Sequence, residues 1–263
     1  MALTGQEIKY LLSLHNKRER AGKKQFLLEG VRLLEEALAA DYLPRALFYA
    51  PSETNERGQK LIRGFIARGI EAQTISAREC GRLADTKSPQ GIVALFDARE
   101  FNLEQQLATQ PRRILVCDQI ADPGNLGTLI RSAAAFNFNL VITTDGSAEV
   151  TNPKTIRATM GGFFKIPMIS GVNDIDLSKR LKKSGYKIYS ADVRGKDIGR
   201  SAPKADKAAL VIGSEAAGSG HILADGADYR IKIPMSKNVE SLNAAVAGSI
   251  LMFWINTRER IKK

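Results

Sequence analysis

The chain has 263 residues, enough for one large domain or two smaller ones that each bury a sizeable core. Hydrophobic residues make up 44% of it, which excludes wholesale disorder, and it shows no 18-residue apolar run and no secretion signal at its start. Two cysteines, Cys80 and Cys117, are too few for a disulfide framework or a Cys-rich zinc site. We therefore expect a cytoplasmic protein with buried free thiols, no metal and no membrane segment.

The chain is strongly basic, with a net charge of +11 and a pI near 9.7. Such an excess indicates a polyanionic partner, nucleic acid first, although generic solubility is an alternative explanation. The excess lies in two segments: residues 1–24 carry a net +4 and residues 179–207 a net +7. Each segment predicts a contact with phosphate backbone, but exposed helices often carry such charge without a ligand.

In the first hundred residues short helices and strands alternate. The hydrophobic pattern predicts helices over 5–20, 31–40, 55–69 and 78–85, and strands over 25–30, 44–50, 71–76 and 90–97. This is typical of an α/β module. A polar, Gln-rich stretch over 101–111 with a short helix at Leu103–Ala108 marks the junction. We place the first domain at 1–104 and the second at 105–263.

The second half alternates strand and helix more clearly. We expect strands over 113–118, 139–144, 164–170, 186–192, 207–213 and 229–235, and helices over 126–137, 152–162, 174–185 and 241–260. This order predicts a mainly parallel sheet covered on both faces. Because ligands of such sheets bind beyond the carboxyl ends of the strands, the loops of interest are 118–125, 213–220 and 234–241.

Several common catalytic sites are absent from the sequence. It contains no P-loop motif, no dinucleotide-binding G-x-G-x-x-G after a strand, and no G-x-S-x-G nucleophile elbow. His15 and His221 are its two histidines, too few to build a zinc site with two cysteines in ordinary sequence. An enzyme built from this chain would use Asn, Arg, Glu and Ser, or a bound cofactor.

Each of the three loops has a functional and a structural interpretation. In "DPGNLGTLIRSAAAFN", Asn125 can cap the next helix and Arg131 can swing toward the loop, or this is a capped helix with a surface arginine. In "LVIGSEAAGSG", Glu215 follows a buried strand, where a carboxylate needs a partner, or it is solvated on a Gly-rich connection. In "IPMSKNVESLNAAVAGS", Ser241 and Asn243 line an electropositive helix start, or Ser241 is a helix cap only.

Taken in order, these stretches resemble the three motifs of the SpoU/TrmH family of RNA ribose 2′-O-methyltransferases, within the SPOUT superfamily. The resemblance covers about residues 110–260. It extends more weakly over the first hundred, where "KKQFLLEGVRLLEEAL" and "SPQGIVALF" resemble a ribosomal-protein-like RNA-binding domain. It implies an α/β fold whose parallel sheet contains a deep trefoil knot near residues 210–249, a rare exception to unknotted topology. It also implies S-adenosylmethionine as cofactor, RNA as substrate and a homodimer.

The resemblance also carries site residues onto this chain. It assigns catalysis to Asn125, Arg131, Glu215, Ser241 and Asn243, and cofactor binding to Gly213, Ile233, Met235, Leu242, Thr143 and Thr144. Ala216 departs from the family pattern, which often has glycine there. In the family the arginine is assigned as the base that activates the ribose hydroxyl. Since an arginine is normally protonated, an equal alternative is that Arg131 anchors the substrate phosphate.

Three rival interpretations remain open at this point. One is a superfamily member that methylates a base, and another is a tRNA 2′-O-methyltransferase. The third is a non-catalytic RNA-binding protein of ribosome assembly, which the presence of all five catalytic residues argues against. The two-domain layout favours an enzyme of large-subunit (23S) ribosomal RNA.

Overall fold

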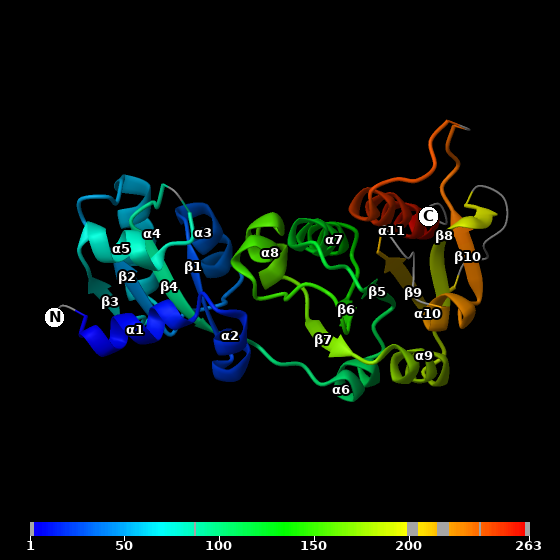
Figure 1. The fold of residues 1–263 in the computed structure, drawn as a ribbon, viewed down its shortest axis with the longest axis horizontal. Coiled ribbons are helices and arrows are strands. Elements are labelled where there is room, and N and C mark those ends of the chain that lie inside the picture. The colour runs from blue at the N-terminus through cyan, green and yellow to red at the C-terminus, as the bar shows by residue number, and fades with distance from the viewer. Residues whose placement is uncertain (1–2, 87, 199–204, 215–220, 237, 261–263) are drawn as a thin grey trace. The chain divides into compact units, whose positions relative to one another are not determined.

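The computed structural model describes residues 3–86, 88–198, 205–214, 221–236 and 238–260. The chain divides into two compact units (Figure 1). The first comprises Met1–Arg99 with Thr151–Pro153, and the second comprises Glu100–Val150 with Lys154–Lys263. Within the described ranges, no helix is both long and apolar enough to cross a bilayer.

The first unit contains a four-stranded sheet in the order β1-β4-β2-β3, in which β4 is antiparallel to β1 and β2, and β2 is parallel to β3. Its strands are β1 (Gln25–Glu29), β2 (Ala46–Tyr49), β3 (Ala72–Thr74) and β4 (Ile92–Asp97). Its helices are α1 (Gly5–Ser13), α2 (Lys17–Lys23), α3 (Val31–Ala39), α4 (Glu56–Ile66) and α5 (Ala77–Leu83).

Helices cover this sheet in two layers. Leu27 and Val93 belong to a core cluster with Leu11 of α1 and Leu83 of α5. Since neighbouring side chains of a strand point to opposite faces, Phe26 of β1 lies on the other face. There α3 and α4 contact each other and the strands. The layer formed by α1 and α5 and the layer formed by α3 and α4 therefore lie on opposite sides of the sheet.

The second unit contains a six-stranded sheet in the order β10-β8-β9-β5-β6-β7, and every neighbouring pair is parallel. Its strands are β5 (Arg113–Asp118), β6 (Leu140–Thr144), β7 (Met168–Val172), β8 (Lys187–Asp197), β9 (Ala208–Gly213) and β10 (Tyr229–Lys232). Its helices are α6 (Leu103–Ala108), α7 (Pro123–Ala135), α8 (Pro153–Ala158), α9 (Asp174–Lys183), α10 (His221–Asp225), α11 (Ala244–Arg260) and the 3-10 turn η1 (Gly162–Phe164).

The central strands β5, β6 and β9 are buried along their whole length, as expected for a parallel sheet covered on both faces. On one face Leu115 and Leu210 join a core cluster with Leu129 of α7 and Leu251 of α11. On the other face, a second cluster joins side chains of the same strands to α9 and α10. The predicted α/β class and the covered parallel sheet are confirmed.

Several predicted elements have different limits. The helix expected over 5–20 is two helices, because the chain turns at Leu14 and Asn16 caps α2. The strand expected over 164–170 begins only at Met168. The strand expected over 186–192 continues to Asp197, since it pairs with β10 beyond an irregularity. Helix α10 has no counterpart in the prediction. The short helix at Leu103–Ala108 is confirmed to the residue.

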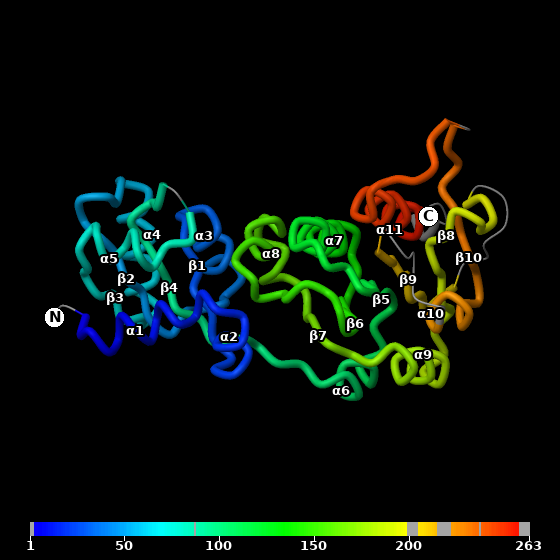
Figure 2. The backbone as a smooth tube through the Cα atoms, in the orientation of Figure 1, coloured from blue at the N-terminus to red at the C-terminus, as the bar shows by residue number. Residues whose placement is uncertain are grey.

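The described cations of the basic segment 179–207 do not form one surface. The segment includes the end of α9 and all of β8. Strand β8 runs from the edge where the strands begin (the amino edge) to the edge where they end (the carboxyl edge), as the backbone trace in Figure 2 shows. The amide of Lys187 bonds to the carbonyl of Lys207 at the amino edge. Arg194 and Lys196 lie near the carboxyl end of the same strand. These cations therefore belong to two opposite edges of the sheet.

Both cysteines are buried free thiols, as predicted. Burial raises the pKa of Cys80 to about 11, with smaller contributions from the charges of Glu29 and Glu53. Burial also raises the pKa of Cys117 far above its usual range, and neighbouring Asp118 acts in the same direction. Neither residue is poised to act as a nucleophile.

Candidate active site

The carboxyl ends of three neighbouring strands bring the predicted loops together. Asp118, the last residue of β5, is the register partner of Gly213, the last residue of β9. On the other side of β5, Cys117 pairs with Thr143 of β6, so Thr144 also ends its strand at this edge. The first and second predicted loops thus start side by side, as the parallel-strand rule requires.

Asp118 and Thr144 hold the start of the first loop. Asp118 is completely buried, and the hydroxyl of Thr144 donates to its Oδ1 at 2.7 Å. The same hydroxyl oxygen accepts the amide of Gln119 at 3.0 Å. A buried carboxylate needs such partners, because unpaired charge is costly away from water. Thr144 therefore fixes the exit of the chain from β5, and Thr143 is buried beside it.

Helix α7 starts earlier than predicted, and its cap is Asp122 rather than Asn125. The Asp122 carboxylate accepts the amide of Asn125 at 2.7 Å, and Pro123 occupies the first turn. Proline is favoured there because its missing N–H would have no partner in the helix anyway. Asn125 is consequently inside the first turn, where its side chain is available for a contact across the site.

The cap of α11 is Asn243, whereas the sequence predicted Ser241. Asn243 Oδ1 accepts the amides of Ala245 at 3.0 Å and Val246 at 3.2 Å. An amide oxygen at this position satisfies helix-start donors that otherwise lack partners. Ser241 is exposed and lies three residues before the helix begins.

The same Asn243 connects the first and third motifs. Its Nδ2 donates to Oδ1 of Asn125 at 2.9 Å. Because the oxygen of Asn243 faces the helix amides, its nitrogen must face Asn125, which sets the orientation of the amide group. Two predicted catalytic residues that are 118 positions apart in the sequence therefore touch directly.

Close packing of α7 on α11 supports this contact. A Cβ on Gly248 of α11 would lie 2.3 Å from Leu129 Cδ2, so the glycine lets the helices approach without displacing that side chain. One turn farther, the hydroxyls of Ser132 and Ser249 are 2.7 Å apart. Arg131 lies between these contacts in sequence, in the third turn of α7, with an exposed side chain. The two helices position Arg131 on the same side of the sheet as the Asn125–Asn243 pair.

The remaining predicted cofactor contacts follow β10. Ile233, Met235 and Leu242 are all half-buried, and Ile233 packs against the core cluster beneath α7 and α11. The described residues between β10 and α11 form neither helix nor strand. This stretch combines apolar side chains with backbone N–H and C=O groups that belong to no helix or strand. Such a combination suits the flat, hydrogen-bonding base of a nucleoside.

One predicted catalytic residue, Glu215, lies outside the described residues, as does Ala216. In the part of the chain that is described, no three His, Cys, Asp or Glu side chains gather as they would around a metal ion. Sequence reasoning missed Asp118 and Asp122. The second had a recognisable signal, since an aspartate directly before proline is typical of a helix start.

Comparison with known proteins agrees with this geometry. Residues 112–253 match the SpoU rRNA Methylase family, and residues 5–94 match the MRM3-like substrate binding domain. The chain is 32% identical to the 23S rRNA (guanosine(2553)-2′-O)-methyltransferase RlmP of Bacillus subtilis, over 94% of this chain and 95% of that protein. It is 28% identical to the mitochondrial rRNA methyltransferase 3 of Mus musculus, over 93% of this chain and 70% of that protein.

Among solved structures, the AdoMet-bound rRNA methyltransferase of Sinorhizobium meliloti superposes with a TM-score of 0.84. The two sequences are 25% identical, and the match covers 98% of each chain. The matched family spans more than half of this chain and includes all three motif loops. With its parallel sheet and its joined first and third motifs, the chain belongs to the SpoU rRNA methylase family.

Proposed function

We propose that this protein transfers the methyl group of S-adenosylmethionine to a ribose 2′-hydroxyl of large-subunit (23S) ribosomal RNA. The observation that carries the proposal is the hydrogen bond between Asn125 and Asn243, which assembles two family motifs at the carboxyl edge of the sheet. The similarity to RlmP over nearly the whole length of both chains supports the RNA class. A cytoplasmic location stays a prediction.

The residues around this edge fit the cofactor. Gly213, Ile233, Met235 and Leu242 would hold it, with Thr143 and Thr144 at the neighbouring strand end. When bound, S-adenosylmethionine supplies an electrophilic methyl group on a positively charged sulfur. The protein then has to position the ribose hydroxyl, exclude water and receive or pass on one proton.

We assign the substrate-facing role to Arg131. A guanidinium carries five N–H donors and normally stays protonated. It can therefore donate hydrogen bonds to two oxygens of a phosphate and orient the adjoining ribose. The family's alternative, Arg131 as the proton acceptor, requires the substrate phosphate to assist. Asn125 and Asn243 hold the two motifs in place, Ser241 is proposed to line the pocket, and Glu215 stays a predicted catalytic residue.

The decisive experiment is Arg131→Ala measured by single-turnover methylation of ribosomal RNA, with the product mapped by nuclease digestion and mass spectrometry. We expect no detectable methylation while calorimetry shows unchanged S-adenosylmethionine affinity. Arg180→Ala, which removes an exposed arginine of α9, is the matched control and should remain active. Wild-type activity of Arg131→Ala, or a methyl group on a base instead of the sugar, would overturn the proposal.

The first unit is proposed to bind the RNA, with domain limits near 1–104 and 105–263. The match to a substrate-binding family supports this role. A shallow, open depression of about 840 Å³ is lined by residues of α1, α2 and the turn between them. Its lining includes Lys9, Tyr10, His15 and Lys23, and the Lys23 ammonium lies 4.4 Å from the Tyr10 ring centre. Cations beside an aromatic ring suit a single-stranded nucleic acid.

A homodimer is proposed through α11. Val246, Ile250 and Phe253 are 47%, 37% and 53% exposed, respectively. Their spacing of four and three residues places them on one face of the helix. The ring of Phe253 lies edge-on to Phe136, with centroids 5.7 Å apart. A continuous apolar stripe of this kind is typical of a subunit interface, so we expect a second copy of the chain to cover it.

A further inference from the structure

Strand β8 contains a large bulge at its carboxyl end. Tyr189 and Ser190 pair with consecutive residues of β10, but the next residue of β10, Ile231, pairs with Lys196. Residues 191–195 of β8 therefore loop out opposite the single peptide bond that joins Arg230 to Ile231. A Cβ on Gly195 would lie 2.7 Å from backbone atoms of Arg230 and Ile231. The glycine lets the bulge rest directly on β10, so this segment has a defined conformation.

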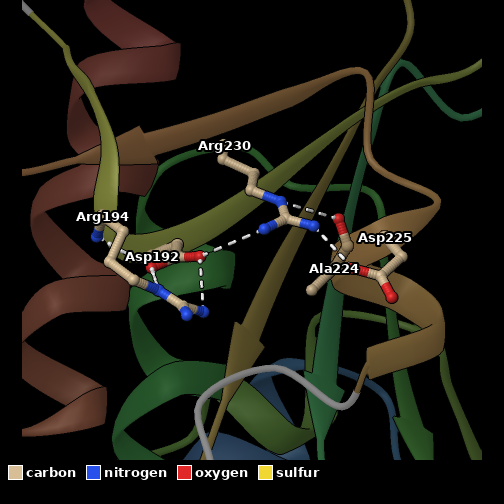
Figure 3. Close-up of polar contacts among 5 residues, drawn as sticks. All are labelled: Asp192, Arg194, Ala224, Asp225 and Arg230. Atoms are coloured by element: carbon tan, nitrogen blue, oxygen red, sulfur yellow. Dashed lines mark hydrogen bonds and ion pairs between the residues drawn. The ribbon is translucent and has the colours of Figure 1, made fainter.

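The bulge presents one carboxylate to two arginines (Figure 3). Asp192 Oδ1 accepts the amide of Arg194 at 2.8 Å and its Nε at 3.3 Å, and Oδ2 accepts Nη2 at 3.4 Å. Arg230 approaches Asp192 to 3.9 Å while bonding to Asp225 at 2.6 Å and to the carbonyl of Ala224 at 3.2 Å. Asp192 thus holds the Arg194 guanidinium directly and forms a longer ion pair with Arg230, which Asp225 and the Ala224 carbonyl hold in place.

Exposure differs sharply across this cluster. The Asp192 side chain is 9% exposed, whereas that of Arg194 is 83% exposed. Burial by itself would raise the pKa of Asp192, but the amide and guanidinium of Arg194, with Arg230, outweigh it and lower that pKa. The carboxylate therefore stays charged at neutral pH. It holds one edge of the Arg194 guanidinium and leaves the rest of it facing water.

The bulge lies at the edge of the sheet that holds the active site. Ser190 is level with Val211 of β9, and β9 ends two residues later at Gly213. The bulge follows Ser190 directly, so it leaves the sheet where the second motif begins. On its other side, Ile233 of the third motif is three residues beyond Arg230.

We propose that Arg194 binds a backbone phosphate of the RNA strand that crosses this edge. Nε and one Nη2 hydrogen are directed at Asp192, and the remaining donors of the five in a guanidinium can bind two oxygens of a phosphate. Fixing one edge beforehand reduces the entropy lost on binding. This inference rests on the proposed function, since it assigns a further contact to the same RNA.

A purely structural role explains the Arg194 side chain less well. The bulge is already held by the Arg194 amide, by the contact of Gly195 with β10 and by Arg230. An ion pair with so exposed an arginine adds little to stability. Its removal should therefore leave the fold intact.

The test compares Arg194→Ala and Arg194→Lys with Arg180→Ala, which removes another exposed arginine paired to an aspartate, on α9. RNA affinity of the full-length protein is measured at several salt concentrations. We expect Arg194→Ala to raise the Kd for RNA about tenfold and to reduce the salt slope by about 0.7–0.9. The Arg194→Lys variant should keep the salt slope of wild type but bind RNA more weakly, because lysine lacks the planar pair of N–H donors that can bind two phosphate oxygens. Arg180→Ala should match wild type.

Two further measurements separate the alternatives. The melting temperature and S-adenosylmethionine affinity should be unchanged in Arg194→Ala, while the KM for RNA should rise with the Kd. A loss of S-adenosylmethionine affinity equal to the loss of RNA affinity would mean that Arg194 binds the cofactor carboxylate, and would overturn the inference. An unchanged Kd and salt slope for RNA would also overturn it. Failure of the proposed function itself is distinct, because then the wild type would not methylate RNA.

Discussion

Asn243 uses both ends of its side-chain amide, and this lets one substitution separate stability from catalysis. In Asn243→Asp, carboxylate oxygens can still accept the amides of Ala245 and Val246, since Asp and Asn cap helices equally well. The donor to Asn125 is removed. We expect the free energy of unfolding to stay within about 0.5 kcal/mol of wild type, while single-turnover methylation slows about tenfold because one hydrogen bond is missing.

Asn243→Ala provides the comparison, because it removes the cap and the donor together and should also cost about 1 kcal/mol of stability. Urea denaturation and single-turnover rates on the same protein samples give both quantities. If Asn243→Asp methylates RNA at the wild-type rate, the contact with Asn125 has no role in catalysis.

At the scale of elements, the α1–α2 surface should bind RNA and the α3–α4 layer should not. Lys9 and Lys17 are exposed on the first surface, while Lys60 and Arg63 are exposed on α4, across the sheet. We expect Lys9→Ala with Lys17→Ala to weaken RNA binding and to reduce the salt slope by roughly 0.7 for each phosphate that the protein no longer binds. Filter binding at several salt concentrations measures both. An equal weakening in Lys60→Ala with Arg63→Ala would contradict a specific surface and indicate bulk charge alone.

The first and last residues of a helix or strand could be predicted where neighbouring residues in the sequence determine them. Helix α6 was predicted to the residue within a polar, Gln-rich stretch, and the structure shows that Asn102 caps it. The start of α7 was missed since Asn125 was expected to cap it, although Pro123 suits a first helical turn. The bulge of β8 has no local signal. It exists only because Lys196 pairs with Ile231, a residue distant in the sequence.

The candidate site shows the same division between local and distant information. The motif order proposes which residues belong to it, which stays a prediction, and the strand rule predicted that the loops after β5 and β9 start together. Neither could predict that Asn243 takes the capping role from Ser241, or that it bonds to Asn125. Those contacts depend on how closely α7 and α11 pack, which Gly248 controls through its missing side chain.

At the scale of the whole molecule, the exposed apolar stripe on α11 is the proposed interface of a homodimer. Ile250→Glu places a charge at the centre of the stripe, and burying it without a partner is costly. We expect this variant to sediment as a monomer. Ile175→Glu on α9 is the matched control, because Ile175 is 46% exposed outside the stripe, and it should remain a dimer. A dimeric Ile250→Glu would place the interface elsewhere.

The two buried thiols have a practical consequence for measuring how this enzyme works. With the pKa of Cys80 at about 11 and that of Cys117 higher still, neither presents an appreciable thiolate to maleimide reagents in the native state. A single cysteine introduced at an exposed position would then be the one fast-labelling site of the folded protein. Fluorophores attached in this way to each unit in turn would report RNA docking in real time, without first removing the native cysteines from two hydrophobic cores.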